Sequence, residues 1–300
     1  MVSIPLANRK DRFSIFILCM VTLSSLSSTT NADSPCFDVM NYGALGDGKT
    51  DDSQGFALTG NGTTDGQGAG SWEEKNTRVT ALKFNYCEDL ELEGLTHINP
   101  QKSHISLHNC DGANVSNITT SAPEDSLNTD GIDISCSNHV QIQDANIGTG
   151  DDCIAINSKC SFINITNITC GLGHGISIGS LGDPTEGTFD TVSKAYVQSC
   201  NFTGQNTTGV TIKTWQGGHG EVKNITYQDI TFDNIARPIV IDQFYCPDGA
   251  CKHNNNTNTS ALAISNVSYT RISGTSSRDE VVSLLCASDV QPSADKCLSS

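Results

Sequence analysis

Three short phrases recur at a fixed interval: Asp130-Gly131-Ile132-Asp133-Ile134, Asp152-Cys153-Ile154-Ala155-Ile156 and His174-Gly175-Ile176-Ser177-Ile178. Their first residues are 22 positions apart in both steps. A constant period of this length is typical of a solenoid, in which each repeat stacks on its neighbour. The alternating β-branched residues indicate that the stacked element is a strand. The stretch therefore predicts an all-β fold built of parallel coils.

The same period brings two carboxylates and one imidazole together. Strands in register lie about 4.8 Å apart, so Asp130, Asp152 and His174 are expected to be vertical neighbours on one wall. Strict alternation, however, puts Asp130 on the side of Ile132, which faces the interior. The wall therefore requires a bend or bulge at the second residue of each phrase: Gly131, Cys153 and Gly175.

Short alternating apolar segments extend this pattern from Leu82 to Ile241. Strands of this length cannot bury both faces alone, so their hydrophobic side is expected to line a shared interior. Asparagine comes before an apolar residue at several turns, and asparagine tolerates left-handed backbone. We therefore predict corner residues of the coil at Asn117, Asn146, Asn167 and Asn201.

Composition excludes some partners. The chain has 300 residues, enough for one sizeable domain or two small ones, and its net charge is −16. A strongly acidic chain does not attract nucleic acid, so nucleic acid is excluded as a partner. Apart from the N-terminal segment, no apolar run is long enough to cross a bilayer, and no membrane partner is expected.

The N-terminus has the pattern of a secretory signal. A basic patch is followed by the apolar run Phe13–Leu23 and then by small polar residues as far as Ala32. The alternative is a buried first helix. We interpret residues 1–32 as a signal peptide and residues 33–300 as a single domain, which predicts a secreted, extracellular protein. Eleven Asn-x-Ser/Thr sequons then predict a glycoprotein, although several coincide with strand corners.

The cysteines predict disulfides. Of the 13 in the sequence, Cys19 would leave with the signal, and an even number would remain in an oxidising compartment. No CxxC pair with metal spacing occurs, so no metal is expected. The favoured bridges are close in sequence: Cys153/Cys170, Cys246/Cys251 and Cys286/Cys297. Four others are candidates for small apolar residues in the interior: Cys87, Cys110, Cys136 and Cys200.

Three motifs resemble those of a known family. Asn128-Thr129-Asp130-Gly131, Gly150-Asp151-Asp152-Cys153 and Gly171-Leu172-Gly173-His174-Gly175-Ile176-Ser177 resemble the signature motifs of polygalacturonases, the pectin-hydrolysing enzymes of glycoside hydrolase family 28. Val210-Thr211-Ile212-Lys213-Thr214-Trp215-Gln216-Gly217-Gly218 stands where the fourth motif lies. The resemblance runs from about Phe37 to the C-terminus. Flanking segments are similar to plant members: Asp38-Val39-Met40-Asn41-Tyr42-Gly43 and Ile241-Asp242-Gln243-Phe244-Tyr245-Cys246.

The resemblance implies a fold and an activity. The fold would be a right-handed parallel β-helix, the solenoid also found in pectin lyases. The activity would be hydrolysis of α-1,4 galacturonosyl bonds of pectin and homogalacturonan with inversion, in cell wall modification. The partner would be pectin or polygalacturonate, no cofactor would be needed, and the protein would act as a monomer.

The resemblance also implies roles for individual residues. Asp151 would protonate the leaving glycosidic oxygen, Asp130 and Asp152 would hold and activate the attacking water, and His174 would support these proton transfers. Lys213 would pair with a substrate carboxylate, and two further substrate contacts would be Asn128 and Tyr245.

The chemistry agrees with these roles. Inverting hydrolysis needs an acid and a base roughly 6.5–9.5 Å apart, which leaves room for water. Three crowded carboxylates cannot all ionise freely, so one pKa is expected to rise above its reference of about 3.9. That carboxyl could serve as an acid at mildly acid pH.

Two departures from the family suggest an alternative. The fourth motif of the family begins with arginine, which binds a carboxylate bidentately, but Thr211 stands at that position. Relatives also have additional coils where Gly55–Thr59 is the whole connection, so N-terminal coils are expected to be partly missing. The alternative is a catalytically impaired, pectin-binding wall protein. A calcium-dependent pectate lyase on a similar β-helix would need a calcium site and a strong base beside the aspartates, and the sequence supplies neither.

Overall fold

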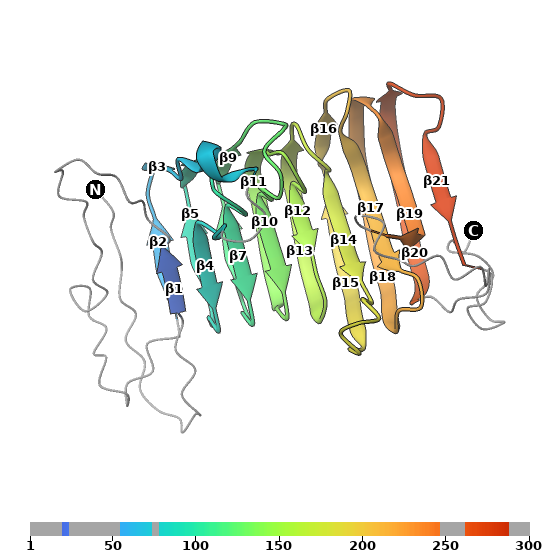
Figure 1. Cartoon of the computed structure of the whole chain (residues 1–300), viewed down its shortest axis with the longest axis horizontal. Helices are drawn as coiled ribbons and strands as arrows, with labels where there is room; N and C mark the ends of the chain where they lie inside the picture. Colours follow the sequence, from blue (N-terminus) through green and yellow to red (C-terminus); the bar gives the residue numbers. More distant parts are fainter. Residues whose placement is uncertain (1–19, 24–54, 74–77, 247–261, 288–300) are drawn as a thin grey trace.

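The computed structural model describes residues 20–23, 55–73, 78–246 and 262–287 (Figure 1). These residues form strands almost throughout, with one short 3-10 helix, η2. The elements are β1 (Met20–Leu23), β2 (Ala57–Thr59), β3 (Thr63–Asp65), η2 (Gly68–Ser71), β4 (Leu82–Asn85), β5 (Glu91–Glu93), β6 (Thr96–Ile98), β7 (Ile105–His108), β8 (Asn114–Ser116), β9 (Thr119–Ser121), β10 (Ile132–Ser135), β11 (Asn138–Gly148), β12 (Ile154–Ile156), β13 (Cys160–Cys170), β14 (Ile176–Leu181), β15 (Asp190–Gln198), β16 (Asn201–Thr203), β17 (Thr208–Trp215), β18 (Gly220–Ile235), β19 (Arg237–Tyr245), β20 (Ala263–Ser276) and β21 (Val282–Leu285).

The strands stack into an elongated parallel β-helix, seen from the side in Figure 1. One sheet of nine strands, here called the site sheet, has the order β1-β4-β7-β10-β12-β14-β17-β19-β21. A second sheet of 12 strands contains the remaining strands. Consecutive strands of the site sheet from β4 onward pair in parallel, and each crossover passes through the second sheet. The predicted all-β parallel solenoid is confirmed.

The three repeated phrases stack in register. Ile132 pairs with Ile154 on the next strand, and Ile154 pairs with Ile176 on the one after. The register therefore stacks the first isoleucines of the three phrases in one column and the second isoleucines in another. All six of these isoleucines are fully buried, and burying each contributes about 1.5–3 kcal/mol relative to exposure.

The remaining core consists of similar columns. Buried residues of both sheets meet along the axis and form one continuous hydrophobic cluster. Its largest members include Phe84, Phe202 and Tyr227, the last of which stacks on Tyr269 of the next coil with ring centroids 4.9 Å apart. Since every coil shares its interior with the next, the isolated strands of three or four residues are stable only as part of the stack.

A column of left-handed residues turns the chain within the second sheet. Asn117 and Asn167 have φ values of 54° and 55°, as the corner prediction requires. The prediction is wrong for Asn146 and Asn201, because the left-handed residues at this corner are Asp144 and Ser199, two positions earlier. The corner therefore follows the sheet register rather than the identity of the side chain, and carboxylate or hydroxyl residues occupy it as well as asparagine.

One predicted disulfide lies wholly within the described residues. Cys153, just before β12, is bonded to Cys170, the last residue of β13. Cys246 and Cys286 are also disulfide-bonded, but the partners predicted for them, Cys251 and Cys297, lie outside the described residues. The bridge at Cys153 links a corner of the site sheet to the second sheet.

The other cysteines divide between two roles. Cys87 is fully buried in the core, as predicted, but it is disulfide-bonded and not a free thiol. Cys110 and Cys200 are buried free thiols, and burial raises the pKa of Cys200 to about 12. They fill the interior as predicted. Cys136 is also free but only partly buried.

The predicted signal peptide lies outside the described residues except for Met20–Leu23. These four residues form β1, which pairs antiparallel with β4 at the end of the site sheet. The described residues include no helix that is long and apolar enough to span a membrane.

Candidate active site

The site lies where the chain passes from the second sheet into the site sheet, just before β10, β12 and β14. Strands β10, β12 and β14 begin at the isoleucine of each repeated phrase, so Asp130, Asp152 and His174 precede the strands instead of lying within them. Alternation therefore does not place them inward. At Gly175 φ is 71°, and an added Cβ would lie 1.9 Å from the carbonyl oxygen of Gly209. The bend predicted at this position thus needs glycine.

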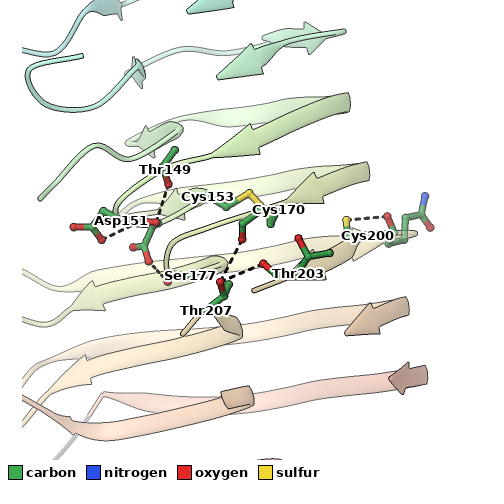
Figure 2. Close-up of a disulfide and its surroundings, with 11 residues drawn as sticks. Thr149, Asp151, Cys153, Cys170, Ser177, Cys200, Thr203 and Thr207 are labelled. Carbon is green, nitrogen blue, oxygen red and sulfur yellow. Dashed lines mark hydrogen bonds between the residues drawn. A yellow bond between two sulfur atoms is a disulfide. The ribbon is translucent and has the colours of Figure 1, made fainter. Parts of the chain in front are cut away.

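Backbone hydrogen bonds hold these loops on top of one another. The amide of Gly131 donates to the carbonyl of Asp152 at 2.9 Å, and the amide of His174 donates to that of Asp151 at 2.8 Å. Thr149 Oγ1 also donates to the Asp151 carbonyl at 2.9 Å. Figure 2 shows this loop beside the Cys153–Cys170 disulfide. The corner is therefore braced both covalently and by its main chain.

Asp151 is the more exposed of the two adjacent aspartates. Its Oδ1 lies 2.9 Å from His174 Nδ1 and accepts the amide of Asp152 at 2.9 Å, while its Oδ2 accepts Asn128 Nδ2 at 3.2 Å. Burial acts to raise the pKa of Asp151, but the hydrogen bond and charge of His174 outweigh it and lower that pKa. In return, the bond to Asp151 raises the pKa of His174. The pair is therefore an ionised carboxylate beside a protonated imidazole at mildly acid pH.

Asp152 has a different environment although it is the next residue. Its side chain is 6% exposed; Oδ1 accepts Ser177 Oγ at 2.7 Å and Oδ2 accepts Lys213 Nζ at 2.9 Å. Burial raises the pKa of Asp152, and Lys213 opposes that shift. Burial in turn acts to lower the pKa of Lys213, but Asp152 outweighs it and the pKa is raised. The lysine therefore keeps its charge while buried.

Asp130 belongs to a carboxyl pair that sequence reasoning missed. Its side chain is hydrogen-bonded to Asp133, and burial together with the charge of Asp133 raises the pKa of Asp130 well above its usual value. Ser103 Oγ donates to Asp133 Oδ2 at 2.5 Å. The rise in pKa expected for one of the crowded carboxyls therefore occurs at Asp130, which retains its proton. The pKa of Asp151 is lowered instead.

Lys213 and Tyr245 form the next part of the wall. Lys213 Nζ lies 5.7 Å from the ring centroid of Tyr245, whose ring in turn meets Trp215 edge-on at 6.4 Å. The family resemblance predicts that Lys213 pairs with a substrate carboxylate; in the structure its ammonium donates to Asp152. Thr211 lies beside Ser177 in the sheet register and is 8% exposed, and its buried Oγ1 has no hydrogen-bond partner among the described residues.

The residue between the two isoleucines of each repeated phrase is a signal by which further site residues could have been predicted. Asp133 and Ser177 occupy the same place in their phrases, between two buried isoleucines, and both contact a site carboxyl. A polar residue at this place faces the outside of the coil, beside the wall. By contrast, Arg78, which contacts Asn128, comes from a segment 50 residues earlier and has no motif around it.

The acidic cluster also has the spacing of a cation site. Among the described residues, Asp151, Asp152 and His174 each offer one ligand atom within 4.8 Å of the others, so carboxyl oxygens of Asp151 and Asp152 lie closer together than the roughly 6.5–9.5 Å expected for an acid and a base of an inverting enzyme. In this chain, hydrogen bonds and ion pairs link Asp151 to His174 and Asp152 to Lys213. The arrangement is therefore a network of internal ion pairs suited to moving protons.

Comparison with known proteins identifies the family. A family model for glycosyl hydrolases family 28 matches residues 46–296. A probable polygalacturonase of Arabidopsis thaliana is 46% identical over 239 residues, which is 80% of this chain and 52% of that protein. A polygalacturonase of Persea americana is 40% identical over 251 residues, covering 79% of this chain and 52% of the relative. The chain thus spans about half the length of these curated relatives.

Solved structures show the same fold at lower identity. An endo-xylogalacturonan hydrolase from Aspergillus tubingensis has a TM-score of 0.66 at 23% identity, covering 81% of this chain and 75% of that one. A polygalacturonase from Erwinia carotovora has a TM-score of 0.60 at 24% identity, covering 79% and 71%. An endopolygalacturonase I from Stereum purpureum, complexed with two galacturonate, has a TM-score of 0.54 at 20% identity, covering 79% and 80%. The family model and the plant relatives together establish that this chain belongs to family 28 of the glycosyl hydrolases.

Proposed function

We propose that this chain is a secreted polygalacturonase that hydrolyses the α-1,4 galacturonosyl bonds of pectin with inversion. The observation that carries the proposal is the contrast between Asp151 and Asp152. One carboxylate faces the outside beside a protonated imidazole, and its neighbour is buried against an ammonium. Glycoside hydrolysis requires such a pair, in which two carboxyl groups are given different roles by their surroundings.

Asp151 delivers the proton to the glycosidic oxygen. Burial acts to raise its pKa, but the hydrogen bond and charge of His174 outweigh burial and lower that pKa. A polyanionic substrate adds negative charge at this point, and a like charge raises the pKa of a carboxyl. The proton on His174 Nδ1, 2.9 Å from Asp151 Oδ1, is the nearest supply. Substrate binding thereby converts Asp151 into the acid, supported by His174.

Water is the nucleophile in this account. Both oxygens of Asp152 accept a hydrogen bond, from Ser177 and Lys213, and these bonds hold the carboxylate in place. Each carboxylate oxygen has a second lone pair, so Asp152 can still accept a proton from water. Asp130, which retains a proton, orients that water. Attack by water in a single displacement inverts the anomeric carbon.

The substrate assignment draws on the relatives and on the site. The curated relatives are named polygalacturonases, and the Stereum purpureum enzyme is complexed with galacturonate. Lys213 and Tyr245 lie beside the acid and offer a cation and a ring to an acidic sugar. The exposed Asn167 and Asn117, each in a sequon, support the expectation of a glycosylated protein of the cell wall. No cofactor is required by these steps, and a monomer is expected.

The test is turnover of polygalacturonate by the purified chain. Wild type is expected to release reducing ends, and Asp151→Asn is expected to release at least about 100-fold fewer per unit time, the scale of general acid catalysis. Circular dichroism of both proteins serves as the folding control. A folded wild-type chain that releases no reducing ends would refute the proposal.

A second candidate, a pectin-binding wall protein without turnover, is favoured by one feature. Thr211 stands where the fourth motif of the family has arginine, and the ammonium of Lys213 is bonded to Asp152. The fourth motif therefore offers little positive charge to an acidic substrate. Co-sedimentation with pectin in the absence of released reducing ends would support this candidate, and normal turnover would exclude it.

A further inference from the structure

Arg78 reaches the acid through an intermediate residue. It lies in the segment before β4, two strands of the site sheet away from β10. Its Nη1 donates to the carbonyl oxygen of Leu127, and its Nη2 donates to Asn128 Oδ1 at 2.6 Å. A guanidinium donates through a rigid fork, so two acceptors on one loop fix both its position and its direction.

Asn128 joins this cation to the carboxylate. Its Oδ1 accepts from Arg78, and its Nδ2 donates to Asp151 Oδ2 at 3.2 Å. The backbone of Asn128 is left-handed, with φ of 57°, a conformation that asparagine tolerates. An amide has one acceptor end and one donor end, so the arginine and the aspartate impose the same orientation on it.

The hydrogen bond from Asn128 to Asp151 Oδ2 is important because different groups hold Oδ1. Oδ1 is fixed by His174 and by the amide of Asp152. Among the described residues, Asn128 is the donor to Oδ2. The plane of the carboxyl therefore depends on Asn128, whose own orientation depends on Arg78.

We propose that Arg78 is a positioning residue that sets the amide orientation of Asn128 and, through it, the orientation of the Asp151 carboxyl. Its effect on rate rests on the proposed hydrolase function, whereas its effect on geometry does not. Arg78 is not assigned a contact with the substrate.

The kinetic test compares Arg78→Ala with two other variants. Misplacing a reacting group by about 1 Å costs on the order of 10²-fold in rate, so Arg78→Ala is expected to lower kcat about 10- to 100-fold with KM near wild type. Arg78→Lys should recover part of the loss, because an ammonium supplies the charge without the fork. Arg271→Ala is the matched control, since Arg271 bonds Asp229 at the surface of the second sheet. It should leave kcat unchanged.

A double-mutant cycle separates positioning from a direct effect. If Arg78 acts through Asn128, the double variant Arg78→Ala/Asn128→Ala should have the same kcat as Asn128→Ala alone. Additive losses would overturn the proposal, because they would mean that Arg78 acts on the reaction independently. A raised KM with kcat unchanged would also overturn the proposal, because that result would mean that Arg78 contributes to substrate binding.

A measurement without substrate keeps the geometric claim separate from the hydrolase proposal. The side-chain amide resonances of Asn128 can be assigned by comparison with Asn128→Ala. Asp151→Asn should shift these resonances in an otherwise wild-type chain, because Nδ2 bonds the carboxylate. In an Arg78→Ala chain the same substitution should leave them unmoved. Equal shifts in both backgrounds would overturn the positioning role, whether or not the wild type cleaves polygalacturonate.

Discussion

Lys213 Nζ donates to Asp152 Oδ2 at 2.9 Å, joining two coils through an ion pair whose side chains are 15% and 6% exposed. The bond ties the cation of the fourth motif to a carboxylate of the second. It makes the two motifs one unit, in which the charge of each residue depends on the other.

Removing the cation should destabilise the fold. Lys213→Met leaves the buried Asp152 without its partner, and breaking a buried pair in this way costs about 3–5 kcal/mol. The control is Lys223→Met, since the Lys223–Glu221 pair is 43% and 39% exposed and such pairs contribute about 0–1 kcal/mol. Urea unfolding of both variants checks the contrast. Equal losses of free energy of unfolding would contradict it.

Asp130→Asn should lower turnover and raise the free energy of unfolding near pH 7. In the folded wild type the pKa of Asp130 is raised by burial and by Asp133, so the folded chain loses stability as pH rises from about 3.9 through the folded-state pKa. The asparagine variant lacks this loss. Its free energy of unfolding should equal that of wild type near pH 3 and exceed it near pH 7, while turnover falls by at least about 100-fold. A stability difference independent of pH would count against the raised pKa.

His174 should titrate above its ordinary range. Asp151 raises the pKa of His174, so the stabilising pair is complete below about pH 6.5 and is lost as pH rises through the folded-state pKa. A proton NMR titration of the imidazole should give a midpoint above about 6.5, and Asp151→Asn should lower it. A His174 midpoint unchanged by the substitution would show that the pair does not form.

Thr211→Arg should strengthen binding of polygalacturonate. Thr211 is adjacent to Ser177 in the sheet register, and its hydroxyl has no hydrogen-bond partner in the part of the chain that the structure describes. A guanidinium there adds a hydrogen bond to a charged group, about 1.5–3 kcal/mol, which lowers KM roughly 10- to 100-fold with little change in kcat. Thr211→Val is the control, because it removes the unpaired hydroxyl without adding charge and should leave KM unchanged. If both variants share the wild-type KM, the fourth motif does not contact substrate here.

The parts of the fold that depend on periodicity could be predicted from the sequence. The 22-residue spacing of the isoleucine pairs leads directly to the observed register of Ile132, Ile154 and Ile176, because parallel strands stack identical positions. Corner asparagines were less predictable. Several residue types tolerate left-handed backbone, so Asp144 could take the corner that was expected at Asn146.

Contacts between distant segments were beyond sequence reasoning. The position of Asp133 between two isoleucines could have marked it as outward-facing, but only the structure shows its carboxyl against that of Asp130. Arg78 meets Asn128 because two coils stack, and nothing local to either residue encodes that contact. The bond between Lys213 and Asp152 likewise depends on the lengths of the intervening loops.

We propose that this corner hydrolyses a galacturonosyl bond by a single displacement. The proposal is tested most directly by proton NMR of the first products formed when the purified full chain acts on an oligogalacturonate. The account predicts that the new reducing end appears first as the β-anomer and then mutarotates. Initial formation of the α-anomer, or no product from a folded chain, would contradict it.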